Sequence, residues 1–329
     1  MIRRYHRFLA VTLSAVMTVL PSAALAAGTQ TEEPLADTVA QVILDSGDAD
    51  FAENEAAGIL VLAEDNAAEA DPATEAQPLP EDGVRVVFNG KELVLEQYAR
   101  LIDGNSYVPV REFFGIMGCT VTWDSTAGCI RIIRDGELEG SLVSGSRLAR
   151  FNGRCWYMTA ACVLADGAAM IPLRDAARIF NAQVAWNADT RTVSLSGYGL
   201  LESGETYYNA EDLLWIARIV RHEAGNQPLE GKVAVANVII NRMRSAAFPN
   251  TAEEVIFDTR SGVQFVTRSS TAIYKAPSEE CWLAAKLALE GYETAPDCLY
   301  FSSNAVAKRC WAGRNRAVYA VIGGHTFFL

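Results

Sequence analysis

The clearest helical pattern of apolar positions along the chain lies between residues 211 and 225. Leu213, Ile216 and Val220 recur at spacings of three and four, and Glu223 continues the series three residues later. These spacings place all four side chains on one face of an α-helix. A carboxylate on a buried face is poorly hydrated, which disfavours its charged form and raises its pKa. A carboxylic acid that stays protonated near neutral pH can donate a proton to a leaving group.

The pattern of Glu223 also permits a structural interpretation. A glutamate on a buried helix face commonly pairs with an arginine, and Arg218 and Arg242 are the candidates here. From helical position alone, this core ion pair is the favoured interpretation. The residues that follow Glu223 shift the preference from this structural interpretation toward a catalytic one.

The apolar pattern after Glu223 predicts further helices and a small sheet. Residues 229–245 are mostly apolar on all sides, which predicts a largely buried helix. Thr251 is a suitable cap for the next segment, and a third helix is expected over 281–289. Residues 299–304 have strand and turn character, and the chain closes with the segment 322–328. Together they predict a mainly helical domain with a small β-hairpin sheet over 206–329, after a Gly-containing hinge at 198–205.

Upstream of this region the polar and apolar positions repeat with a period of 63 residues. Each repeated unit contains an Asn-Gly turn, an Asp-Gly turn, an apolar-Pro-apolar-Arg segment and a strand ending in tryptophan. The matching segments are 88–90 and 151–153, 103–104 and 166–167, 108–111 and 171–174, and 121–123 and 184–186. The constant offset predicts a duplicated β-rich, ββαββ-like module over 83–198. The fold class is therefore α+β.

The N-terminal residues predict export. A basic start, a short apolar run from Phe8 to Leu20 and a small-x-small site at Ala24–Ala26 predict a signal peptide over 1–26. Residues 27–82 form an acidic stretch, in which 28–82 hold 15 Asp and Glu and no Lys or Arg. This composition predicts a disordered spacer. Since it accounts for the negative net charge of −12, the remaining chain is balanced and shows no basic surface for nucleic acid.

Seven cysteines in an exported chain predict at least some disulfides. We expect Cys155 to pair with Cys162 and Cys298 with Cys310, and the odd count leaves at least one cysteine that is free or pairs between molecules. A zinc site is not expected, because only three histidines are present and Asn226 stands where His222-Glu223 would need a second histidine. No cofactor and no metal are expected.

The 63-residue repeat resembles the bacterial domain called copper amine oxidase N-terminal domain-like, over about 84–196. The resemblance implies a non-catalytic module of secreted cell-surface proteins, and this segment has no histidine for copper. Arg111 and Arg174 could bind an anionic wall polymer as a partner. Structural ion pairs at the two helix starts are the favoured alternative.

The C-terminal region is similar to the SleB/CwlJ-type cell wall hydrolases, known as spore cortex-lytic enzymes. The motifs that carry the resemblance cover nearly all of 210–329 in order: 217–224, 231–242, 248–249, 264–265, 300–301 and 322–327. It implies a fold like that of goose-type lysozymes and lytic transglycosylases. It also implies that peptidoglycan is the substrate, that the bond between N-acetylmuramic acid and N-acetylglucosamine is cleaved, and that Glu223 is the catalytic acid.

The residues agree with a mechanism that needs one carboxylate. Ordinary glycosidases use two, and the nearest candidates for a second, Asp258 and Glu230, lie in polar surroundings. A lytic transglycosylase needs only one group that acts first as acid and then as base. The predicted substrate-binding residues are Gln264, Phe265, Tyr300, Asn304 and Trp311. The aromatic side chains among them could equally be core, and we expect His325, Phe301 and Phe327 to be structural.

Three other functions stay open at this stage. The enzyme could be a hydrolytic muramidase, or the chain could be a non-enzymatic cell-wall-binding protein that has lost activity. A cysteine peptidase or amidase that uses a thiol with His325 is a further alternative, although no cysteine motif supports it. The expected location is outside the cell, in the cell wall or associated with the spore, with no membrane segment after signal cleavage.

Overall fold

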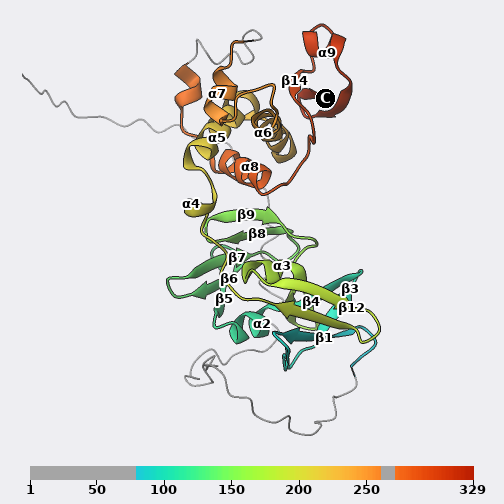
Figure 1. Ribbon diagram of the computed structural model, residues 1–329. Coiled ribbons are helices and arrows are strands. Elements are labelled where there is room, and N and C mark those ends of the chain that lie inside the picture. The colour runs from blue at the N-terminus through green and yellow to red at the C-terminus, as the bar shows by residue number, and fades with distance from the viewer. Residues whose placement is uncertain (1–78, 261–270) are drawn as a thin grey trace, which may run out of the picture.

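The computed structural model describes residues 79–260 and 271–329. The predicted signal peptide and acidic spacer lie outside the described residues. Figure 1 shows a β-rich module, a short connecting segment and a helical domain from which a small lobe at the C-terminal end extends. This mixture of helices and strands confirms the predicted α+β content. Within the described residues, no helix is both long and apolar enough to cross a membrane.

The module is built from two sheets. The first has the order β10-β11-β4-β3-β1-β13-β12, with β2 also paired to β1, and the second has the order β5-β6-β7-β8-β9. The strands are β1 (Gly83–Phe88), β2 (Lys91–Glu92), β3 (Ala99–Ile102), β4 (Asn105–Pro109), β5 (Thr120–Asp124), β6 (Cys129–Arg134), β7 (Leu138–Leu142), β8 (Leu148–Phe151), β9 (Arg154–Tyr157), β10 (Val163–Ala165), β11 (Ala168–Pro172), β12 (Gln183–Asn187) and β13 (Thr192–Ser196). Two short helices, α2 (Val110–Ile116) and α3 (Leu173–Ile179), complete the module.

Equivalent elements of the module stand 63 residues apart. The helices α2 and α3 start and end 63 positions apart, and so do β4 and β11, and β5 and β12. Asn89 and Asn152, which precede glycine in the two Asn-Gly turns, both adopt positive φ at +48°, the conformation that a tight hairpin turn requires. Strands of the two halves pair with each other in one sheet, since β1 pairs in parallel with β13 and β4 pairs antiparallel with β11.

A single aromatic core fills the space between the sheets and the two short helices. Phe113, Phe114, Phe151, Trp156 and Phe180 are all buried. The rings of Phe114 and Phe151 stack at 6.1 Å with an interplanar angle of 9°. Side chains from both halves of the repeat thus share one core, which is why neither half is expected to fold alone.

The helical domain places two buried helices at its centre. These are α5 (Ala210–Ala224) and α6 (Leu229–Arg244), and they pack with α7 (Ala252–Phe257) and α8 (Glu279–Leu289). Thr251 caps α7, as predicted, by accepting a hydrogen bond from the Glu254 amide at 3.3 Å. A 3-10 helix η2 (Thr271–Tyr274) contacts α5. A three-stranded sheet and α9 (Trp311–Asn315) form the C-terminal lobe, with strands β14 (Tyr300–Ser303), β15 (Val318–Ile322) and β16 (His325–Phe328).

The segment predicted to be a hinge is fixed to the module. Leu201 is buried in the module core, and its carbonyl accepts a hydrogen bond from the Asn152 side chain at 2.9 Å. The Tyr198 ring stacks on Phe180 at 6.1 Å. Helix α4 (Gly204–Tyr207) follows, and the Gly204 amide donates to the Asn152 carbonyl at 2.6 Å. The connection is therefore a packed element of the structure.

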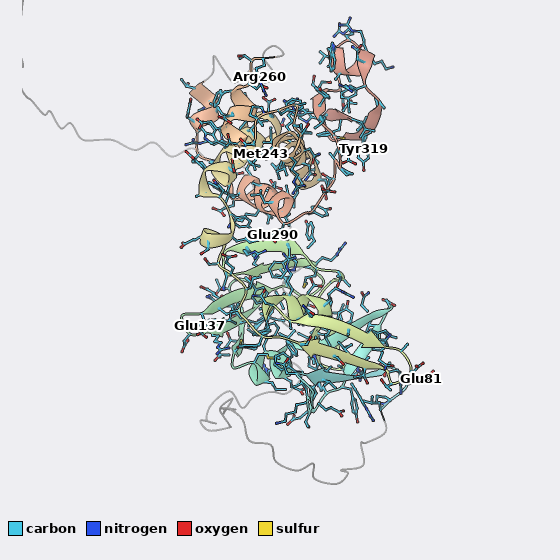
Figure 2. All side chains as sticks on the ribbon, viewed as in Figure 1. Glu81, Glu137, Met243, Arg260, Glu290 and Tyr319 are labelled. Atoms are coloured by element: carbon cyan, nitrogen blue, oxygen red, sulfur yellow. The ribbon has the colours of Figure 1, made fainter. Side chains whose placement is uncertain are left out.

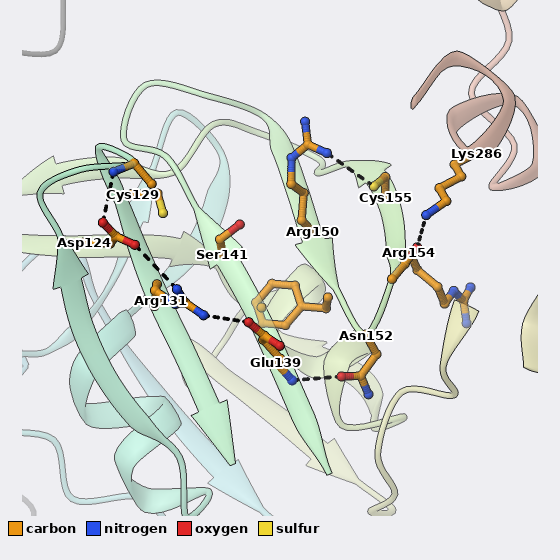
Figure 3. A pocket seen from close by; sticks show the side chains of 14 residues that line it. Asp124, Cys129, Arg131, Glu139, Ser141, Arg150, Asn152, Arg154, Cys155 and Lys286 are labelled. Atoms are coloured by element: carbon orange, nitrogen blue, oxygen red, sulfur yellow. Dashed lines mark hydrogen bonds and ion pairs between the residues drawn. The ribbon is translucent and has the colours of Figure 1, made fainter. Parts of the chain in front are cut away.

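A buried carboxylate joins the module to the helical domain. Glu290, at the end of α8, is 1% exposed and lies at the junction of the two parts (Figure 2). It accepts hydrogen bonds from Arg154 at 2.7 and 2.8 Å, from Arg178 at 2.5 Å and from the Tyr208 hydroxyl at 2.8 Å. Nearby, Lys286 of α8 donates to the Gly153 carbonyl at 2.6 Å (Figure 3). The helical domain is thereby held against β9 of the module.

The cysteine pairing predicted from the sequence is wrong in this structure. All seven cysteines are free thiols, and six of them are buried. Cys155 lies on β9 beside the Arg150 guanidinium, whereas Cys162 is fully buried beyond the end of that strand. Cys310 caps α9 instead, since its sulfur accepts a hydrogen bond from the Gly313 amide at 3.3 Å. Between Cys155 and Cys162 the chain leaves β9 after Tyr157 and bends at Thr159 and Ala160.

Candidate active site

The candidate acid Glu223 lies in the last turn of α5. Asn209 starts this helix by accepting hydrogen bonds from the amides of Glu211 and Asp212, both at 3.0 Å. The apolar face predicted from the sequence is buried, with Ile216 and Val220 at 0% exposure. The Glu223 side chain, on the same face, retains 22% exposure. The carboxyl group is therefore largely desolvated and still accessible from one side.

Burial raises the pKa of Glu223 above its ordinary value, and the neighbouring His222 partly opposes that shift. The His222 Nδ1 atom lies 3.2 Å from the Glu223 Oε1 atom. Desolvation penalises the carboxylate form, whereas a nearby imidazolium favours it. The net direction is upward, as the position on the apolar stripe predicted. Glu223 therefore holds a proton to higher pH than a solvated glutamate does.

Neither arginine considered as a structural partner pairs with Glu223 among the described residues. The Arg218 guanidinium lies over the rings of Trp215 and Tyr274, at 4.8 and 5.8 Å from their centroids. The Arg242 Nε atom donates to the Leu299 carbonyl at 2.7 Å. Both cations are thus directed elsewhere, and the core ion pair that helical position favoured is not formed with them.

The segment after α7 carries two of the predicted substrate-binding residues, Gln264 and Phe265, which lie outside the described residues. The described residues that flank the segment make hydrogen bonds. On one side, Asp258 accepts two hydrogen bonds from the Arg260 guanidinium at 3.0 and 3.1 Å. On the other, Arg221 of α5 donates to the Ala272 carbonyl at 3.2 Å. The returning end of this segment is therefore attached two residues before Glu223.

Tyr300 and Trp311 come together in the C-terminal lobe. Their ring centroids are 5.3 Å apart, and the Arg316 guanidinium lies 5.3 and 5.4 Å from the two centroids. Tyr300 is half-buried, and Trp311 is 52% exposed. An aromatic pair with an exposed indole and an adjacent cation can bind an apolar sugar face and an anionic group.

Asn304 is engaged within the protein. Its amide nitrogen donates to the Gly323 carbonyl at 3.0 Å, and its carbonyl oxygen accepts from the Thr326 hydroxyl at 2.8 Å. These bonds hold the β15–β16 turn beside the end of β14. A role in shaping the lobe fits these contacts better than direct sugar binding.

Sequence reasoning missed Gln227, which ties this turn to the end of α5. The Gln227 Oε1 atom accepts a hydrogen bond from the Gly324 amide at 2.6 Å. Gly323 has φ of +57°, and a Cβ atom there would lie 2.5 Å from Gln227 Oε1. The paired glycines near the C-terminus were the available signal, because they indicate a close backbone approach. The lobe is therefore attached four residues after Glu223.

His325 occupies the structural position expected for it. It is 8% exposed and makes an edge contact with the Phe301 ring at 5.5 Å, while Phe327 is fully buried. Burial lowers the pKa of His325 below its ordinary value. Its aromatic neighbours, and the burial of six of the seven thiols, do not support a peptidase built from a cysteine and His325.

Comparison with known families confirms the resemblance seen in the sequence for both regions. The cell wall hydrolase family matches residues 226–328, and the copper amine oxidase N-terminal domain family matches residues 87–195. Glu223 precedes the matched range of the hydrolase family by three residues. The helical domain and the module therefore each match a different family.

Similar proteins carry the name spore cortex-lytic enzyme. One from Bacillus cereus is 35% identical over 120 residues, which is 36% of this chain and 45% of that protein. Those from Oceanobacillus iheyensis and Bacillus subtilis are 34% and 32% identical over 120 residues, covering 36% of this chain and 42% and 38% of theirs. The chain therefore spans less than half the length of these relatives.

Two solved structures are also similar. The catalytic domain of the germination-specific lytic transglycosylase SleB from Bacillus anthracis is 32% identical, with a TM-score of 0.34, over 39% of this chain and 100% of that one. The catalytic domain of the Bacillus cereus SleB protein is 34% identical, with a TM-score of 0.34, over 37% of this chain and 92% of that one. TM-scores of 0.34 do not establish a common fold between this chain and the two solved structures.

Proposed function

We propose that this chain is a secreted peptidoglycan-cleaving enzyme and that Glu223 is its catalytic acid and base. The observation that carries the proposal is a largely buried, still accessible carboxyl group with a raised pKa, adjoining a wall hydrolase domain. The bond to be cleaved is the β-1,4 bond between N-acetylmuramic acid and N-acetylglucosamine. The similarity to enzymes named for spore cortex lysis supports this class of substrate.

The protonated Glu223 donates its proton to the glycosidic oxygen as the bond from C1 of the muramic acid residue breaks. The developing positive charge at C1 is then captured by the 6-hydroxyl of the same sugar. Glu223, now a carboxylate, takes the proton from that hydroxyl, and a 1,6-anhydro sugar forms. One group thus serves as acid and then as base, and it ends the cycle protonated.

The surroundings of the two candidates for a second carboxylate favour this one-carboxylate mechanism. Hydrogen bonds from Arg260 lower the pKa of Asp258 below its ordinary value, so this group is ionised and already paired. Glu230 is exposed in the first turn of α6. Residues 261–270 contain no aspartate or glutamate. A lytic transglycosylase is therefore favoured over the hydrolytic muramidase, which needs a second group to hold a water molecule.

Substrate binding would involve two groups of the predicted residues. Tyr300 and Trp311 would contact sugar rings from the C-terminal lobe, and Gln264 and Phe265 would do so from the segment after α7. The lysozyme-like character of the domain, export through the predicted signal peptide, and binding of a wall polymer by the module are parts of the same proposal. The site of action would be the cell wall or the spore.

The test is release of soluble fragments from purified sacculi and from spore cortex by the Glu223→Gln variant. This change keeps the side-chain volume and removes the titrating group, so release should fall at least a thousandfold while the thermal unfolding midpoint does not fall. The matched controls are Asp258→Asn and Glu230→Gln, which should retain most of the activity. Undiminished release by Glu223→Gln would contradict the proposal. Product masses then separate an anhydro sugar from the hydrolytic product, which is one water heavier.

A further inference from the structure

The module contains two grooves that occupy equivalent positions in its 63-residue register. One has a volume of about 360 Å³ and lies between the start of α3 and the β3–β4 turn. The other has a volume of about 390 Å³ and lies between the start of α2 and the β10–β11 turn. Every residue that lines the first groove has a counterpart 63 positions away in the lining of the second. Arg174 and Trp186 correspond in this way to Arg111 and Trp123.

The charges that line the two grooves differ. No carboxylate lines the groove at Arg174, where the polar groups are Asn105, Ser106 and Thr159. Three carboxylate residues line the groove at Arg111, namely Glu96, Glu112 and Asp166. Two equivalent sites have therefore diverged, and one of them presents a cation without an opposing anion in its lining.

The carboxylate next to Arg174 in the sequence does not neutralise it. Asp175 is 5% exposed and points into the module, where it accepts hydrogen bonds from Trp156 Nε1 at 3.2 Å and from the Thr159 amide and hydroxyl at 2.9 and 2.7 Å. The ion pairs among the described residues do not include Arg174. The structural ion pair favoured for it from sequence is therefore not formed with any residue in 79–260 or 271–329, and within these ranges its guanidinium is available to a ligand.

Trp186 supplies the second recognition element. Its side chain is 45% exposed on β12 and lines the groove together with Arg174. An exposed indole offers a flat apolar face that packs on the ring of a sugar, while a guanidinium binds a carboxylate or phosphate through two hydrogen bonds. The polar side chains of the groove can bind hydroxyl and acetamido groups.

We propose that the groove at Arg174 and Trp186 binds one acidic sugar unit of a wall glycan, and that the equivalent groove at Arg111 does not. The choice of a wall glycan rests on the proposed function of the chain, whereas the preference for an anionic sugar rests on the groove alone. The acidic group is a carboxylate if the ligand is the peptidoglycan strand, and a phosphate if it is a polymer attached to that strand.

The experiment measures co-sedimentation of the full chain with sacculi, in the Glu223→Gln background so that the glycan stays intact. Arg174→Gln should weaken binding about tenfold, as expected for the loss of a charge-assisted hydrogen bond, and Trp186→Ala should weaken it to a similar extent. The matched controls Arg111→Gln and Trp123→Ala should leave binding unchanged within experimental error. Unaltered thermal unfolding midpoints would show that each variant is folded.

Sacculi treated with hydrofluoric acid, which removes phosphate-linked polymers, separate the two sources of the acidic group. Loss of the Arg174 effect after treatment would assign a phosphate, and its persistence would assign a carboxylate. Equal losses from both grooves, or no loss from the Arg174 groove, would overturn the proposal. Fragment release is measured separately with Glu223 intact, so a failure of the catalytic proposal is distinguishable from a failure of this one.

Discussion

The Nδ1 atom of His222 lies 3.2 Å from the Oε1 atom of Glu223, and this contact partly offsets the effect of burial on the pKa of the candidate acid. Burial raises the pKa of the carboxyl group, while the neighbouring imidazole lowers it. The two residues are adjacent in sequence, yet their interaction depends on how the last turn of α5 is buried. The proton affinity of Glu223 is therefore a balance between burial and one neighbour.

Replacing His222 should shift the pH dependence of fragment release. The proposed acid is active when protonated, so the alkaline limb of the pH profile reports its pKa. His222→Gln removes a group that lowers this pKa, and the alkaline limb should move to higher pH. Initial rates of release measured across the pH range provide the test. Arg244→Gln removes an exposed cation from α6 and serves as the control. An alkaline limb that stays in place or moves to lower pH would contradict this role of His222.

Breaking the junction between the module and the helical domain should be costly. Glu290 is buried and bound by Arg154, Arg178 and Tyr208. Glu290→Ala leaves Arg154, itself largely buried, without its anion, and such a loss costs roughly 3–5 kcal/mol. Denaturant unfolding followed by fluorescence should show this loss of stability, with separate transitions for the two parts.

The control for the junction is Glu293→Ala. Glu293 lies 3.9 Å from Arg244, and both side chains are exposed. Surface pairs of this kind contribute about 0–1 kcal/mol, so the unfolding curve should hardly change.

Burial also raises the pKa of Glu290, but hydrogen bonds from Arg154 and Tyr208 outweigh the effect of burial and bring this pKa below its ordinary value. The junction's contribution should therefore be lost as the pH falls through this lowered pKa. Equal stabilities for both variants would show that the junction adds little.

The thiols should be countable by alkylation. The structure has seven free cysteines, of which Cys310 is the one that is not buried. Alkylation of the denatured chain without reductant should add seven labels, and the native protein should react mainly at Cys310. Mass spectrometry of intact protein measures both numbers. Fewer than seven labels on the denatured, unreduced chain would instead support the pairing expected from an exported sequence.

Part of the site was predictable because it follows from local periodicity. The spacing of Leu213, Ile216, Val220 and Glu223 requires a shared helix face, and burial of that face raises the pKa of Glu223. The position of the thiols was not predictable in the same way. The spacing of cysteines in the sequence does not show whether two sulfur atoms lie within bonding distance. In the structure, the sulfur of Cys310 caps α9.

The sequence by itself determined the helix that carries Glu223, the 63-residue register of the module and the two families that the chain resembles. These features depend on residue spacing, which is present in the unfolded chain. Only the tertiary structure decided that Arg218 and Arg242 turn away from Glu223, that Gln227 holds the C-terminal lobe, and that one of two equivalent grooves lacks carboxylates. These contacts join residues that are far apart in the sequence. They can form only when the folded chain brings those residues together.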